Sequence, residues 1–166
     1  MHESEDTLKL ENQLSFSLYA CSKELIRAYK PLLESLNLTY TQYLAMTVLW
    51  EFGQTNSKVM GRLLYLDSGT LTPVLKALEQ KGYLRRSRGQ LDGRHLIVTI
   101  TDEGYKLKEK AAHIPAEISA TLGLSEKEHA QLSALLEKAP IRADKINNAA
   151  PPVRNFCEQT AYFYVA

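Results

Sequence analysis

The chain has 166 residues, of which 45% are hydrophobic and 23% are charged, with a formal net charge of +1. This length fits one domain with a helical extension, and it allows a sizeable buried core. No stretch approaches the roughly 18 apolar residues of a membrane span, and the polar N-terminus is unlike a secretory signal, so a cytoplasmic location is expected. Two cysteines, Cys21 and Cys157, are too few for a disulfide scaffold and are expected to be reduced.

The first predicted element is a long helix from about Leu8 to Leu36, with a kink or irregular turn expected at Pro31. One narrow apolar stripe of this helix is formed by Leu14, Leu18, Cys21 and Leu25. A cysteine on such a stripe is expected to be buried and unreactive, as a small core residue.

Two shorter helices are predicted next. Thr39 and Gln42 have the spacing of a capping box, so a helix is expected from Thr39 to about Glu51. Another short helix is predicted from about Ser57 to Leu64.

A further helix is predicted within YLDSGTLTPVLKALEQKGYLRR, and it has an apolar inner face and a polar outer surface. Asp67 or Ser68 can cap it, Gly82 ends it, and Pro73 is tolerable only near the first turn. The residues of the polar surface that we single out are Ser68, Thr70, Thr72, Lys76 and Gln80. Small and hydroxyl-bearing side chains let such a surface approach another molecule closely.

Two β-type runs, at 83–88 and 95–100, flank the turn sequence GQLDG and predict a hairpin. The residues near its tip that we single out are Arg86, Arg88, Asp92 and Arg94. Arg94 and Asp92 can form an ion pair that stabilises the hairpin, and this role is compatible with binding a polyanion.

The C-terminal part is expected to be helical. Thr101 is a candidate N-cap for a long helix to about Leu122, bent at Pro115, and SEKE at 125–128 is a capping box for one more helix. We therefore divide the chain into an N-terminal helix (1–36), a central domain (37–100), two further helices (101–146) and a tail (147–166). The tail is apolar, so it either docks on a partner chain or is not native to the protein.

This order of elements predicts a mainly α protein with a small β-hairpin, a winged helix-turn-helix. Residues 60–95 carry seven basic side chains against three acidic ones, a local charge of +4, which leaves −3 for the rest of the chain. Such a segment is an electrostatic footprint for DNA. The polar helix suits the major groove and the basic hairpin suits the flanking minor groove. Because one module reads only a half-site, the flanking helices suggest a homodimer.

Enzymatic chemistry is disfavoured. The four histidines lack metal-ligand spacing, and no nucleophile elbow, dinucleotide-binding or P-loop motif occurs. We expect neither a metal nor another cofactor.

The stretch YLDSGTLTPVLKALEQKG, followed by LDGR, resembles the MarR-type regulators. ENQLSFSLYACSKEL, together with YKPLLESLNLTYTQYLAM, is similar to their organic-hydroperoxide-sensing branch, the OhrR repressors. The resemblance covers roughly Lys9 to Leu136. It implies a homodimeric repressor that interlocks its terminal helices on a pseudo-palindromic operator and leaves this DNA when a reactive cysteine is oxidised.

In that family the cysteine lies in an NQLCF-type motif, and two tyrosines of the partner subunit hold its thiolate. The matching tyrosines are Tyr29 and Tyr40, whereas the cysteine position is Ser15, on a polar flank beside Tyr19. A hydroxyl cannot be oxidised to a sulfenic acid. The chain is therefore either a Cys→Ser variant locked in its DNA-binding form or a natural relative whose sensing has moved or been lost.

Two other functions are compatible with these residues. A small aromatic or phenolic effector can lodge between the dimer helices and the DNA-binding lobe, where Ser15 and the tyrosines would line its pocket. A thiol-dependent peroxidase is disfavoured because the sequence predicts no activated cysteine.

Overall fold

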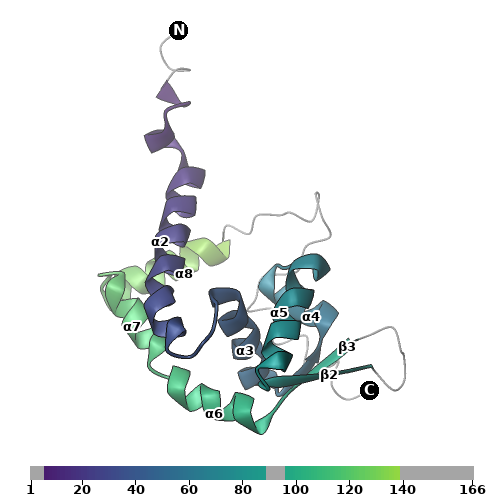
Figure 1. Ribbon diagram of the computed structural model, residues 1–166. Helices are drawn as coiled ribbons and strands as arrows, with labels where there is room; N and C mark the ends of the chain where they lie inside the picture. The colour runs from purple at the N-terminus through teal and green to yellow at the C-terminus, as the bar shows by residue number, and fades with distance from the viewer. Residues whose placement is uncertain (1–5, 89–95, 139–166) are drawn as a thin grey trace.

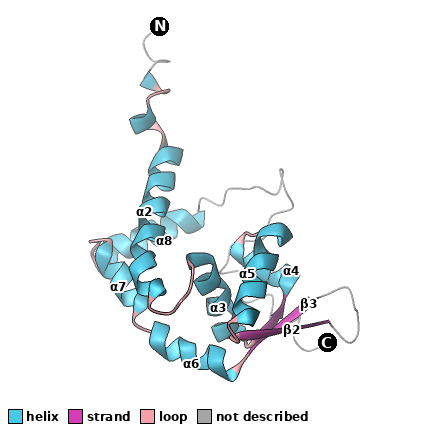
Figure 2. Ribbon diagram, in the orientation of Figure 1, coloured by secondary structure: helices cyan, strands magenta, loops and turns pink. Residues whose placement is uncertain are grey.

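The computed structural model describes residues 6–88 and 96–138, which are mostly helical around a small antiparallel sheet (Figures 1 and 2). The elements in chain order are η1 (Leu10–Asn12), α2 (Leu14–Glu34), α3 (Tyr40–Phe52), β1 (Gln54–Asn56), α4 (Ser57–Leu64), α5 (Ser68–Gln80), β2 (Leu84–Arg88), β3 (Leu96–Ile100), α6 (Asp102–Ala111), α7 (Ile114–Thr121) and α8 (Glu126–Lys138). Within these ranges no helix is long and apolar enough to cross a membrane.

The sheet has the strand order β1-β3-β2. β2 and β3 form the expected hairpin, with Leu84 opposite Ile100 and Arg88 opposite Leu96. β1, which the sequence analysis did not predict, adds to the other edge of β3, where Thr55 lies opposite Val98. The helices α3, α4 and α5, followed by this hairpin, form the predicted winged helix-turn-helix. The GQLDG turn of the hairpin lies outside the described residues.

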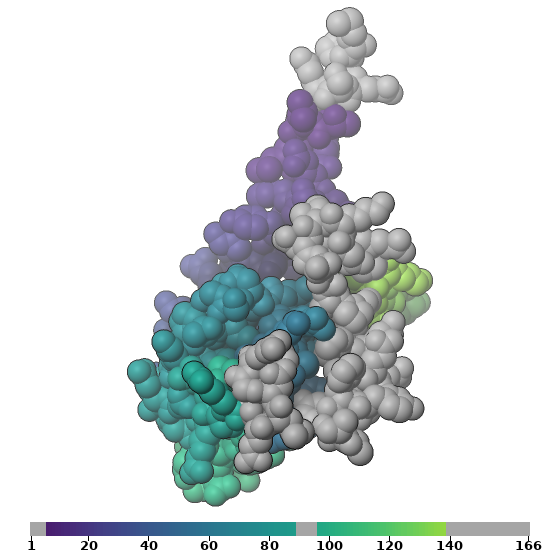
Figure 3. Space-filling model, turned by 90° about the vertical axis from the view of Figure 1, so that its right-hand side faces the viewer, coloured from purple at the N-terminus to yellow at the C-terminus, as the bar shows by residue number. Residues whose placement is uncertain are grey.

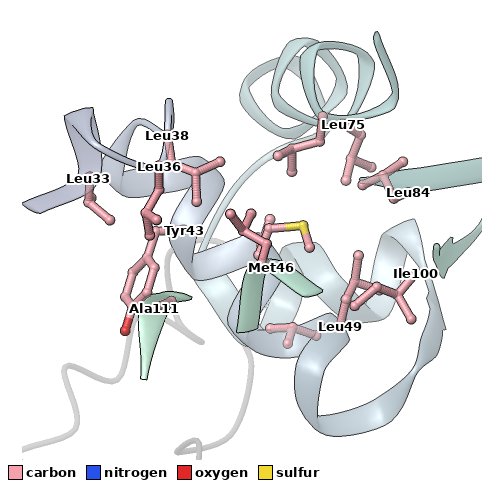
Figure 4. Packing of buried hydrophobic residues seen from close by; sticks show 14 of the residues in the cluster. Leu33, Leu36, Leu38, Tyr43, Met46, Leu49, Leu75, Leu84, Ile100 and Ala111 are labelled. Carbon is pink, nitrogen blue, oxygen red and sulfur yellow. The ribbon is translucent and has the colours of Figure 1, made fainter. Parts of the chain in front are cut away.

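The hydrophobic core lies where α3 and α5 pack against the sheet. Met46 of α3 is fully buried, and its side chain lies among Leu75, Leu84, Leu49 and Ile100 (Figure 4). Leu71, Leu75 and Leu78 of α5 are buried as their spacing predicts. Tight packing of α5 on α3 leaves only the opposite surface of α5 for other contacts.

The predicted N-caps are present. Thr39 and Gln42 form a reciprocal capping box, Asp67 caps α5, and Thr101 caps α6. Ser125 and Glu128 also exchange hydrogen bonds before α8.

The expected single helix from Thr101 to Leu122 is wrong in one respect. The helix is interrupted at Ala112 and His113, which separate α6 from α7, so Pro115 does not bend a continuous helix. Pro115 instead lies at the start of α7, where a missing backbone N–H leaves no helical carbonyl without its partner.

The N-terminal helix also differs from its prediction. It begins at Leu14, after the short η1 turn, and continues through Pro31 to Glu34. Its N-terminal half extends away from the body that α3 to α6 form (Figures 1 and 3). Only its C-terminal part packs well, where Leu33 is buried against the core.

The predicted burial of Cys21 is wrong for the single chain, because Cys21 is exposed. The same stripe leaves Leu14 75% and Leu18 43% exposed, and only Leu25 is half-buried. The apolar pattern is real, but within the described chain no neighbouring element covers it at these positions.

Candidate nucleic-acid interface and sensor region

Helix α5 presents the predicted polar surface to solvent. The five side chains of this surface are all exposed: Ser68, Thr70, Thr72, Lys76 and Gln80. Asp67 fixes the start of the helix, since its Oδ1 accepts a hydrogen bond from the Thr70 backbone N–H at 2.9 Å. Hydrogen bonds from Thr70 lower the pKa of Asp67, so the carboxylate stays charged at neutral pH.

The two threonine hydroxyls already have local partners. Thr70 donates through Oγ1 to Asp67 Oδ2 at 2.9 Å, and Thr72 donates to the Ser68 carbonyl at 2.7 Å. Each hydroxyl can therefore offer a ligand its oxygen as an acceptor and its methyl group for contact. Lys76 and Gln80 are the long, exposed donors of this surface.

Pro73 lies in the second turn of α5, later than its prediction required. Its missing N–H deprives the Gly69 carbonyl of a helical donor. Gly69 is exposed, so water can bond that carbonyl at the start of the helix.

The residues predicted to bind DNA from the hairpin have different environments in the structure. Arg86 is turned toward α5, where its guanidinium forms an ion pair with Glu79, and its side chain is only 20% exposed. Arg88 is exposed at the end of β2. Asp92 and Arg94 lie outside the described residues, so their predicted roles stay predictions.

Glu79 was not predicted as a functional residue, and the one sequence signal near it is Gly82, which ends the helix. Gly82, with φ +78, reverses the chain between α5 and β2, and this reversal brings Arg86 back alongside Glu79. Lys58, Arg62 and Arg85 were also not predicted as individual DNA-binding residues. With Lys76 and Arg88 they are exposed basic side chains on α4, α5 and β2.

The predicted sensor tyrosines pack together near the junction of α2 and α3. The ring centroids of Tyr29 and Tyr40 are 4.9 Å apart, and those of Tyr29 and Tyr43 are 5.7 Å apart. Tyr43 continues the row to Trp50, 5.9 Å away. Burial raises the pKa of Tyr29 and Tyr40, so both phenols keep their protons at neutral pH and can donate hydrogen bonds.

Ser15 and Tyr19 lie elsewhere on α2, and both are exposed. The ammonium of Lys23 lies 5.4 Å from the centroid of the Tyr19 ring. Ser15 and Tyr29 are fourteen positions apart on α2, a rise of about 21 Å along the helix. The structure therefore does not bring Ser15 to Tyr29 and Tyr40 within one chain.

Among the residues that the structure describes, no group of three or more His, Cys, Asp or Glu side chains is placed to hold a metal ion.

Comparisons with known proteins place these features in context. Residues 27–111 match the family model described as "Transcriptional regulator SarA/Rot". The chain is 50% identical over 135 residues to the organic hydroperoxide resistance transcriptional regulator of Bacillus subtilis, covering 81% of this chain and 90% of that protein. It is 39% identical to the regulator SarZ of Staphylococcus aureus strain USA300, covering 72% and 80% of the two chains.

Solved structures give the same fold. Reduced AbfR bound to DNA is 38% identical, with a TM-score of 0.68, over 81% of this chain and 94% of that chain. A complex of Staphylococcus aureus MepR with DNA is 27% identical, with a TM-score of 0.69, over 76% and 95% of the chains.

Proposed function

The chain belongs to the MarR/SarA-type family of DNA-binding transcriptional regulators, and from this we propose that it is a homodimeric repressor of organic hydroperoxide response genes. The observation that carries DNA binding is the exposed polar surface of α5 beside the basic strand β2. Such a helix fits the major groove, with hydroxyl, amide and ammonium groups that can reach bases and phosphates. The similarity to the Bacillus subtilis regulator supports the hydroperoxide branch.

The homodimer is supported by the apolar surface of the two terminal helical regions. Large exposed side chains there are Leu8, Leu10, Leu14, Leu18, Leu132, Leu135 and Leu136. Monomeric proteins rarely leave so many large apolar side chains in water. A second copy that covers these leucines would also bury the stripe on which Cys21 lies.

Ser15 occupies the sensor position in this proposal. Because Ser15 is about 21 Å from Tyr29 along one helix, it can meet this tyrosine pair only across a dimer. The protonated phenols would hold a thiolate, but a serine hydroxyl offers them no anion. The unmodified protein should therefore bind its operator with or without organic hydroperoxide.

The DNA sequence that the protein prefers tests this function directly. Duplexes selected from a random pool by the purified chain are expected to be pseudo-palindromic, with half-sites related by the dimer axis and about one helical turn apart. Enrichment of a single half-site would contradict the dimer, and no enrichment at all would contradict sequence-specific DNA binding.

A further inference from the structure

Lys81, the residue that follows α5, connects this helix to the turn between α2 and α3. Its ammonium donates one hydrogen bond to the Asn37 carbonyl at 2.5 Å and another to Gln42 Oε1 at 2.9 Å. Asn37 has φ +53, a left-handed conformation that holds its carbonyl in a tight turn. One side chain at the end of α5 thus bonds a group in the turn before α3 and a group in the first turn of α3.

The turn that Lys81 contacts also sets the position of Tyr40. Gln42 is buried, and its Oε1 accepts a hydrogen bond from the Thr39 backbone N–H at 3.1 Å as half of the capping box. Tyr40 is the first residue of α3 and lies inside this box. The same amide oxygen therefore receives a donor from the turn before Tyr40 and a donor from the end of α5.

The two hydrogen bonds of Lys81 act as a tether, a polar link between the end of α5 and the start of α3. The Lys81 side chain is half-buried, and burial lowers the pKa of its ammonium. It also lies at the C-terminal end of α5, where the helix dipole favours a cation. Lys76, by contrast, lies on the exposed polar surface of the same helix. The two lysines therefore serve different purposes.

We propose that Lys81 is a positioning residue for DNA recognition, which fixes the end of α5 against the turn that precedes Tyr40. This inference rests on the proposed function, because it takes α5 as the DNA-reading helix and Tyr40 as part of the sensor. A change at the tyrosine pair would reach α5 through the Asn37 carbonyl and Gln42. Lys81 itself need not contact DNA.

The test compares Lys81→Met with Lys76→Met and Lys81→Arg. Affinity is measured over a range of salt for a duplex selected by the unmodified chain and for a scrambled duplex of the same composition. Lys81→Met should weaken binding to the selected duplex by about tenfold, with little change on scrambled DNA and an unchanged salt slope. Lys76→Met should weaken both duplexes and lower the slope by about 1. Lys81→Arg keeps the cation and should retain most of the discrimination.

Amide hydrogen exchange supplies a readout without DNA. In Lys81→Met, exchange should quicken at both residues 36–40 and residues 79–83, while Lys76→Met should leave both segments unchanged. Equal weakening on both duplexes with a reduced slope would make Lys81 a phosphate contact and overturn the proposal. Unchanged discrimination, or unchanged exchange at 36–40, would also overturn it. If the unmodified chain selects no duplex, the proposed function fails, and the exchange still decides whether the tether exists.

Discussion

Glu79 of α5 accepts three hydrogen bonds from Arg86 of β2. The Arg86 backbone N–H donates to Oε1 at 2.9 Å, and its guanidinium donates to Oε2 through Nε at 2.8 Å and through Nη2 at 2.5 Å. The pair spans the reversal at Gly82 and joins the two elements that face DNA in the proposed function. It therefore fixes the direction in which the hairpin leaves the helix.

Glu79→Gln is expected to lower the melting temperature, and the loss should depend on pH. The pKa of Glu79 is lowered first by the Arg86 side chain and then by its backbone N–H. A lowered pKa in the folded state stabilises the protein above the unfolded value of about 4.3, and this gain disappears as pH falls through the folded pKa. The difference in melting temperature between parent and variant should therefore disappear as the pH falls below about 4.

A matched control for this prediction is Glu109→Gln, an exposed glutamate on α6. It should show no comparable gap at neutral pH. A gap for Glu79→Gln that persists unchanged at low pH would mean that packing, and not the ion pair, explains the loss.

Lys76 and Gln80 are predicted to contribute to DNA binding in different ways. Gln80→Ala should cost about 1–3 kcal/mol on a selected duplex and little on random DNA if its amide reads a base edge. Lys76→Ala should weaken both duplexes and lower the salt slope by about 1, as one lost phosphate contact does. Filter binding or fluorescence anisotropy at several salt concentrations separates the two. Equal losses of affinity for both duplexes in Gln80→Ala would mean that Gln80 contacts the DNA backbone and does not read a base.

Local signals in the sequence predicted local structure well. The capping boxes at Thr39 and Ser125 depend on residues three positions apart, so the sequence alone carries all their partners. The bounds of α4 agree with their prediction, and α5 begins after Asp67, one of its two predicted caps. The hairpin was predicted because its two strands flank a short glycine-bearing turn.

Features that depend on distant partners were missed or misread. β1 has only three residues and exists because it pairs with β3, more than forty positions later. The stripe through Cys21 has the same spacing whether its neighbour is in the same chain or in another, so periodicity could not tell core from interface. Glu79 and Lys81 act through contacts that chain reversal creates, and residue type alone does not reveal these.

Leu135→Asp is predicted to shift the protein from dimer to monomer. Leu135 of α8 is 63% exposed in the single chain, beside Leu136 at 52%. A fully buried leucine contributes about 1.5–3 kcal/mol and occurs twice in a symmetric dimer, so the dissociation constant should rise on the order of a hundredfold or more. Sedimentation equilibrium measures the change. Tyr65→Asp is the control, since Tyr65 is 61% exposed but lies at the end of α4. An equal effect of both variants would contradict an interface on α8.

The last prediction concerns Ser15 and the tyrosine pair. Tyr29 and Tyr40 carry phenolic O–H groups, which are protonated at neutral pH and whose pKa burial raises further, so they can donate hydrogen bonds to an anion placed against them. Ser15→Cys should supply that anion as a thiolate. Its sulfur would attack cumene hydroperoxide, break the O–O bond and form a sulfenic acid, releasing cumyl alcohol. DNA binding by Ser15→Cys should then fall on addition of the peroxide, whereas the unmodified chain should stay bound.

Cys21 provides the control that this experiment requires. It is exposed in the single chain, so its inertness depends on the proposed dimer covering its stripe. Cys21→Ala should bind DNA with and without peroxide as the unmodified chain does, and Ser15→Cys combined with Cys21→Ala should keep the restored response. Titrations of all four proteins on the selected duplex decide between the two positions. Release of the unmodified chain by peroxide, abolished in Cys21→Ala, would make Cys21 the sensor and Ser15 a bystander.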